Sequence, residues 1–185
     1  MSDTAHGIGH NNGPAMDAGR SFRVYRWAKA KANRPSASVT PHVIRRRVTR
    51  AKELGLSYAA YASLLETAGR DVGGFLMSAN ALQLRPNRPE PPERILDHLA
   101  GLRNVERIAL IPRGWPLPEA DVFDAIYQAP TPMAAFPRIR MAIAQAQDRR
   151  PAASLVVIGM GLEREWVSAG RLGGFLEASE VFPAA

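Results

Sequence analysis

The sequence predicts an α+β protein in which a helical N-terminal domain, similar to a helix-turn-helix, precedes a small α/β domain of order β-α-α-β-α. Apolar residues recur at helical spacing as far as residue 84, whereas residues 105–111 and 155–158 are short apolar runs typical of strands. Four prolines between residues 85 and 93 indicate a linker. The expected parts are a disordered tail (1–19), a basic helical domain (20–84), a Pro-rich linker (85–93) and the small α/β domain (94–185).

The N-terminal region predicts a tail followed by a basic arm. Residues 1–19 are rich in Gly, Asn and Ala and have no apolar stripe to bury, so we expect them to be mobile. His6 and His10 lack further ligands in this segment, and we expect no metal site. Residues 21–31 can form a short helix with aromatic residues on one side and basic residues around the rest.

Three further helices are expected before the linker. Thr40 can cap a helix that runs to Leu54 and ends at Gly55. Ser57 can cap a second helix that Gly69 ends, and residues 71–82 repeat apolar residues at helical spacing. Arg47 falls in the apolar sector of its helix, and we expect it to pair with an acid such as Glu66 or Asp71.

Residues 47–66, RVTRAKELGLSYAAYASLLE, resemble the DNA-binding helix-turn-helix of bacterial and phage repressors. Ala51 stands where two helices would approach, Gly55 stands in the turn, and Ser57 starts the second helix. The resemblance implies that the second helix would enter the major groove. The residues that would face bases include no Arg, Lys, Asn or Gln, so we expect nonspecific or shape-based binding; a structural αα-hairpin is the alternative.

A wider pattern combines the tail GIGHNNGP with ELGL, a Tyr-x-x-Tyr, GRD and NAL in residues 53–82. In this it resembles a family of uncharacterised bacterial proteins. The resemblance implies a domain unit that ends near Leu84 and implies no activity.

The net positive charge of the chain comes from its first third. Residues 1–53 contain 11 Lys and Arg against 3 acids, and the remaining residues contain 13 Arg against 14 acids. Such segregation favours a polyanionic partner such as nucleic acid. The candidate nucleic-acid-binding residues are Arg23, Arg26, Arg45, Arg46, Arg50, Lys52, Ser57 and Tyr58.

The sequence of the second domain indicates a ligand-binding site. We expect helices at 94–102, 120–128, 131–148 and 162–181 around the two strands. If the strands are parallel neighbours, the loop 112–118 and the turn 159–161 emerge at one edge, where α/β folds bind ligands. The candidate ligand-site residues there are Arg113, Trp115, Glu163 and Arg164.

The chain lacks cysteine and several recognisable motifs, and these absences exclude some classes of protein. The chain has no cysteine, so disulfides, thiolate zinc sites and thiol nucleophiles are excluded. We see no catalytic motif, cofactor motif, signal peptide or membrane span, and we expect a cytoplasmic protein with no cofactor.

The leading hypothesis is a non-enzymatic nucleic-acid-binding or regulatory protein whose C-terminal module senses a ligand or binds a partner. The alternatives are a small α/β enzyme or ligand-binding protein with a basic docking arm, and an adaptor in a larger assembly. A protein partner or a homodimer fits each of them, because two strands make a poor independent sheet.

Overall fold

The computed structural model describes residues 40–182. The chain divides into two compact units, Met1–Val43 and Ile44–Ala185, and the fold below is that of the second unit. The predicted tail, the predicted helix at 21–31 and the candidate residues Arg23 and Arg26 lie outside the described residues.

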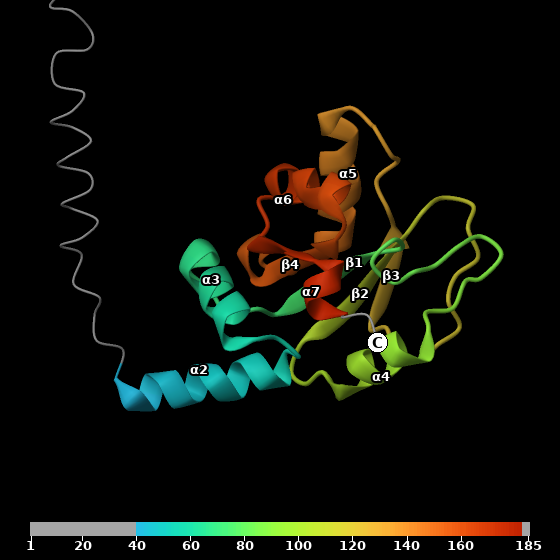
Figure 1. The fold of residues 1–185 in the computed structure, drawn as a ribbon. Coiled ribbons are helices and arrows are strands. Elements are labelled where there is room, and N and C mark those ends of the chain that lie inside the picture. Colours follow the sequence, from blue (N-terminus) through green and yellow to red (C-terminus); the bar gives the residue numbers. More distant parts are fainter. Residues whose placement is uncertain (1–39, 183–185) are drawn as a thin grey trace, which may run out of the picture. The chain divides into compact units, whose positions relative to one another are not determined.

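Five parallel strands form one sheet in the order β3-β2-β1-β4-β5 (Figure 1). The strands are β1 (Gly74–Ser78), β2 (Glu106–Ile111), β3 (Ala125–Gln128), β4 (Leu155–Gly159) and β5 (Gly174–Glu177). The central strand is β1, where Leu76 aligns with Ile108 of β2 on one side and with Val157 of β4 on the other. The predicted mixture of helices and strands is confirmed, and the sheet is larger than the two predicted strands.

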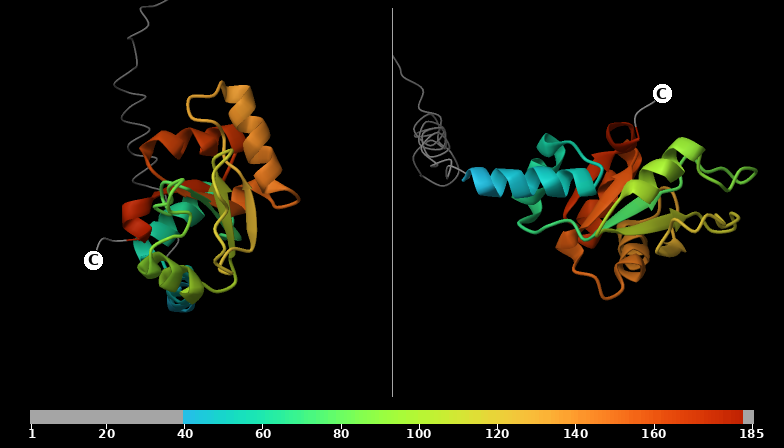
Figure 2. Two further views of the ribbon diagram at one scale, coloured as in Figure 1. Left: turned by 90° about the vertical axis from the view of Figure 1, so that its right-hand side faces the viewer. Right: turned by 90° about the horizontal axis from the view of Figure 1, so that it is seen from below.

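Helices cover both faces of this sheet. They are α2 (Pro41–Glu53), α3 (Tyr58–Ala68), α4 (Glu93–Gly101), α5 (Phe136–Gln147), α6 (Glu165–Gly170) and α7 (Ala178–Val181), with short 3-10 turns η1 (Ala152–Ser154) and η2 (Gly161–Arg164). Helices α5 and α6 pack on one face, whereas α3, α4, α7 and the end of α2 pack on the other (Figures 1 and 2). The helices predicted at 41–54, 57–68 and 94–102 are therefore present, and Ser57 and Gly69 cap α3 as expected.

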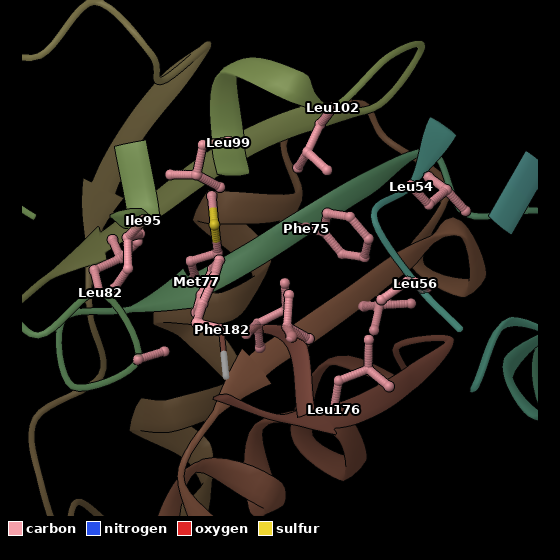
Figure 3. Close-up of a cluster of buried hydrophobic side chains, with 14 of the residues drawn as sticks. Leu54, Leu56, Phe75, Met77, Leu82, Ile95, Leu99, Leu102, Leu176 and Phe182 are labelled. Atoms are coloured by element: carbon pink, nitrogen blue, oxygen red, sulfur yellow. The ribbon is translucent and has the colours of Figure 1, made fainter. Parts of the chain in front are cut away.

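The strands are apolar at successive positions because both faces are buried. In β1, Phe75 and Met77 point into the cluster under α3 and α4, whereas Leu76 points into the cluster under α5 and α6. Figure 3 shows the first of these clusters, where Phe75 lies among side chains from the turn after α2, from α4 and from β5. A parallel sheet covered on both faces produces such continuous apolar runs.

Three strands were predicted as helices, and these predictions are wrong. Strand β1 lies within the helix expected at 71–82, β3 within the helix expected at 120–128, and β5 within the helix expected at 162–181. A short apolar run buried on both faces has no period of two, so it can be mistaken for one side of a helix. The two glycines at the start of β1 were a contrary signal, since Gly74 allows Leu155 and Glu106 to approach its backbone closely.

The proline-rich segment 85–93 lies inside the α/β unit. It connects β1 to α4, and β1 lies in the sheet between two strands that follow the segment in sequence. Prolines were expected to mark a domain boundary, but here they form part of a crossover connection that folds back through a short bridge between Arg85 and Arg88. The helices before the segment and the strands after it share one core.

An ion pair holds the edge strand β3 in register. Arg107 of β2 binds both carboxylate oxygens of Asp124, with its Nε and Nη2 each 2.9 Å from an oxygen. The Arg107 amide also donates to Asp124 Oδ2, at 2.7 Å. Arg107 lowers the pKa of Asp124 through these hydrogen bonds. The segment 112–124 contains no helix, so this contact fixes the chain directly before β3.

A histidine packs at the junction of α4 and the turn after α2. His98 Nε2 is buried without a hydrogen-bond partner, and the ring stands edge-on to Phe182 with centroids 5.3 Å apart. Gly55 has φ of +64°, and a Cβ there would lie 2.7 Å from His98 Nε2. Burial lowers the pKa of His98, so the folded protein keeps this imidazole neutral.

The free energy of unfolding should therefore decrease as pH falls below about 6.5, the ordinary pKa of histidine. Below that pH the unfolded chain binds a proton at His98 that the folded chain resists, so acid favours unfolding, by at most about 1.4 kcal/mol per pH unit. Urea unfolding at pH 7.5, 6.5 and 5.5 measures the slope.

In the His98→Leu variant the slope between pH 7.5 and 5.5 should be shallower than in the wild type. His42→Leu is the control because His42 is exposed on α2, and it should leave the wild-type slope intact. Equal slopes for wild type and His98→Leu would contradict the assignment.

Candidate functional site

The candidate site lies at the carboxyl end of the sheet, where β1 and β4 are neighbours. After β1 the chain continues toward β2 on one side, and after β4 it continues toward β5 on the other. The two connections diverge at this point and leave room between them. In α/β folds with diverging connections, ligands bind outside the carboxyl ends of the strands at this position.

A cavity of about 180 Å³ opens there. Its walls come from the segments that directly follow β1, β2 and β3 and from the chain between Leu162 and Trp166. Most of the wall is apolar and includes Leu110, Pro112, Ala129 and Trp166. The polar lining consists of Ser78, Asn80, Thr131, Glu163 and Glu165, and the lining contains no Lys, Arg or His.

Glu163 is the most buried acidic side chain at the cavity, with 6% of its surface exposed. Its Oε1 accepts a hydrogen bond from Asn80 Nδ2 at 2.8 Å, and its Oε2 accepts one from the backbone amide of Met160 at 2.5 Å. No Lys or Arg within residues 40–182 forms an ion pair with it. The carboxylate is therefore oriented by two donors but has no countercharge within this part of the chain.

Gly159, at the end of β4, permits this arrangement. A Cβ at this position would lie 2.7 Å from Glu163 Oε2 and 3.2 Å from the Phe175 ring. The missing side chain lets Glu163 fold back over the strand end and reach the Met160 amide. The turn Gly159–Gly161, which the sequence analysis places at a ligand-binding edge, thus donates its Met160 amide to a carboxylate of the same chain.

The residues predicted for a ligand site separate in the structure. Glu163 lines the cavity. Arg113 is exposed, and Trp115 packs against the cluster under α4; neither lines the cavity. Arg164 donates to Glu177 at 3.0 Å and lies 4.7 Å from the Phe175 ring centroid.

This separation has a topological cause. The prediction assumed that the strands at 105–111 and 155–158 were neighbours, but β1 lies between them. Sequence reasoning therefore missed two cavity residues: Ser78, the last residue of β1, and Asn80, which follows the strand. Recognising residues 74–78 as a buried strand would have placed Ser78 and Asn80 at the site.

The predicted nucleic-acid-binding residues within the described part of the chain are mostly exposed. Arg45, Arg46 and Lys52 are exposed on α2. Ser57 accepts a hydrogen bond from the Ala60 amide at 3.2 Å, and Tyr58 is exposed at the start of α3.

Arg50 differs from these residues because its guanidinium is fully engaged inside the protein. Its Nε donates to Asp71 at 2.9 Å and its Nη1 donates to Glu53 at 2.8 Å. Three backbone carbonyls accept the other bonds: Val72 (2.8 Å), Asn104 (3.0 Å) and Arg103 (3.3 Å). All five N–H groups of Arg50 thus donate hydrogen bonds. The side chain thereby holds α2 against the segment before β1 and the segment before β2.

Asp71, one of the two acids expected to pair with Arg47, has other partners. Asp71 Oδ2 binds Arg50, and its Oδ1 accepts a hydrogen bond from the Tyr61 hydroxyl at 3.0 Å. Burial, together with this bond to Asp71, raises the pKa of Tyr61 to about 12. Among the described residues, Arg50 rather than Arg47 is the arginine that pairs with Asp71.

Residues 40–182 provide neither a cluster of metal ligands nor a helix that could cross a membrane. This part of the chain contains no group of three or more His, Asp or Glu residues that could hold a metal ion. Its helices are also too short or too polar to cross a membrane.

Comparison of the chain with models of protein families, with curated proteins and with solved structures found no match.

Replacing Arg50 with Ala should lower the free energy of unfolding by about 2–3 kcal/mol, because two carboxylates and three backbone carbonyls lose their donor. Arg50→Lys should recover part of this loss, since an ammonium carries charge but cannot form the fork of five bonds. Urea denaturation monitored by circular dichroism measures both.

Arg46→Ala is the matched control on the same helix. Arg46 is exposed, so its removal should change the unfolding free energy by less than about 0.5 kcal/mol. An equally small effect of Arg50→Ala would show that the network contributes little to stability.

Proposed function

We propose that residues 44–182 form a small-molecule-binding α/β module whose site is the cavity at the carboxyl end of β1 and β4. The observation that carries this proposal is a buried carboxylate, Glu163, that lines an open cavity and keeps free acceptor positions there. Burying a carboxylate without a countercharge costs free energy. A bound ligand would offset that cost.

The mouth of the cavity supports the same proposal. Met133 is 99% exposed and Leu162 is 89% exposed, and both line the cavity. Met160, two residues before Leu162, is 52% exposed. Large apolar side chains grouped at the opening of a pocket are typical of binding sites.

A fragment screen tests the site. We expect some water-soluble fragments of up to about 12 non-hydrogen atoms to shift the backbone amide NMR signals of residues 79–82 and 160–166, because the cavity has room for more than a single water. Thr131→Trp should suppress these shifts, since Thr131 is exposed at the cavity and a large ring there would fill it.

Gln145→Trp is the control, because it adds the same ring at an exposed position of α5 away from the cavity lining. Fragment shifts that Thr131→Trp leaves unchanged would place binding elsewhere. A library that shifts none of these signals would refute the proposed site.

A second function, nucleic-acid binding, is favoured by the charge distribution. The first 53 residues contain 11 Lys and Arg against 3 acids, and Arg45, Arg46 and Lys52 of this segment are exposed on α2. In this proposal α2 and α3 act as a helix-turn-helix that holds phosphates. The exposed positions at the start of α3, Ser57 and Tyr58, offer no bidentate base contact, so binding would not depend strongly on sequence.

The two proposals combine into a regulatory protein whose basic segment binds nucleic acid and whose α/β unit senses a ligand. Arg50 no longer belongs among the phosphate-binding residues, because its donors are used within the protein. Arg23, Arg26, Arg45, Arg46 and Lys52 remain as the proposed contacts.

Affinity for duplex DNA should depend steeply on salt, with a slope of about −4.5 in log K against log salt for these five contacts. The double variant Arg45→Ala, Arg46→Ala should reduce the slope by about 2, because two fewer phosphates release counterions. Fluorescence anisotropy at several salt concentrations measures the slope.

The control is Arg138→Ala, Arg140→Ala, which removes two exposed arginines from α5, outside the basic segment. Its slope should equal that of the wild type. A wild-type slope near zero would refute nucleic-acid binding, and equal losses in both double variants would refute the assigned contacts.

A further inference from the structure

We infer that the cavity selects a small organic cation: a ligand with a protonated amine or a similar donor-rich cationic group that binds Glu163, and with an apolar body that lies against the cavity wall. This inference rests on the proposed binding site and specifies the chemistry of its ligand. It depends on the hydrogen bonding of Glu163, the charge of the lining and the apolar surface at the mouth.

The first observation is the unused hydrogen-bonding capacity of Glu163. A carboxylate has about four acceptor positions. The Asn80 amide group and the Met160 backbone amide use one on each oxygen, which leaves acceptor positions free in a side chain that is 6% exposed. Both neighbours are donors, so they orient the carboxylate without neutralising it. A ligand cation would supply the missing countercharge at short range.

The second observation is the charge of the lining. Its two ionisable residues are Glu163 and Glu165, both acidic, and no basic side chain lines the cavity. A phosphate or carboxylate ligand would meet like charge and find no arginine or lysine to bind it. The order of the strands is that of dinucleotide-binding folds, but the segment after β1, Ala79–Leu82, lacks the glycines that let a pyrophosphate approach. Anionic ligands are therefore disfavoured.

The third observation is the apolar wall. Trp166 and Leu110 line the inner part of the cavity, and Met133 and Leu162 line it while remaining highly exposed. A fully hydrated inorganic cation would gain nothing from this surface. An organic cation with an aromatic or alkyl body would bury part of it, at about 25 cal/mol for each Å² removed from water.

Three probes of matched size and different charge test the inference: 2-phenylethylamine, 2-phenylethanol and phenylacetate. Each is titrated into the full-length protein while the amide signals of residues 79–82 and 160–166 are followed by NMR. We expect 2-phenylethylamine to bind about tenfold more tightly than 2-phenylethanol, as a charge-assisted hydrogen bond to a buried carboxylate provides, and phenylacetate to bind most weakly.

Two variants assign the preference to one carboxylate. Glu163→Gln keeps the size and an acceptor but removes the charge, so the amine should fall to the affinity of the alcohol, whose own affinity should change little. Glu165→Gln is the matched control because Glu165 lines the same cavity but is exposed, and it should retain most of the preference. Thermal unfolding checks that both variants are folded. The ranking of the three probes is measured on the wild-type protein and therefore does not depend on any variant.

The results that would overturn the inferred ligand class differ from those that would overturn the proposed binding site. If the alcohol or phenylacetate binds as tightly as the amine, or if Glu163→Gln leaves the preference intact, the inferred ligand class is wrong while the cavity remains a binding site. If none of the three probes shifts these signals but other fragments do, the class is again wrong. If no fragment of any kind shifts them, the proposed binding site itself fails.

Discussion

Strand β1 pairs with β2 on one side and with β4 on the other, and the remaining structure depends on this central position. A parallel strand with neighbours on both sides has its backbone groups satisfied only within the sheet, and its side chains need cover on both faces. Phe75 and Met77 receive that cover from α3, α4 and α7, and Leu76 receives it from α5 and α6. Because the chain runs from β1 to β2 on one side and from β4 to β5 on the other, the connections diverge at the carboxyl ends of β1 and β4.

The candidate site is a consequence of that divergence. The diverging connections leave a cavity at the ends of β1 and β4, and a glycine at the end of β4 lets Glu163 fold into its wall. Asn80, which follows β1, reaches the same carboxylate, so the two central strands each contribute to its orientation. The arrangement places a buried negative charge beside apolar surface, which is the basis of the ligand chemistry proposed above.

Arg50 and Glu163 show two different uses of buried charge in this chain. Arg50 has every donor engaged, by two carboxylates and three backbone carbonyls, and it serves to hold α2 against the loops before β1 and β2. Glu163 has two donors and no countercharge within residues 40–182. Arg50 therefore has a structural role, whereas Glu163 is the residue on which the proposed binding site depends. The two residues looked alike in sequence, as charged side chains within predicted helices.

The sequence by itself determined the local features: the helices α2, α3 and α4 with the caps of α3, the strands β2 and β4, the segregation of positive charge and the inclusion of Glu163 in a candidate site. These depend on side-chain period and on residues close in the chain. Only the tertiary structure decided that residues 74–78 form the central strand, that Arg50 is engaged within the protein, and that Asn80 meets Glu163. Each of these depends on partners distant in sequence, such as Asp71 and Asn104 for Arg50. The periodicity and spacing of residues along the chain do not indicate which distant segments become neighbours in a sheet.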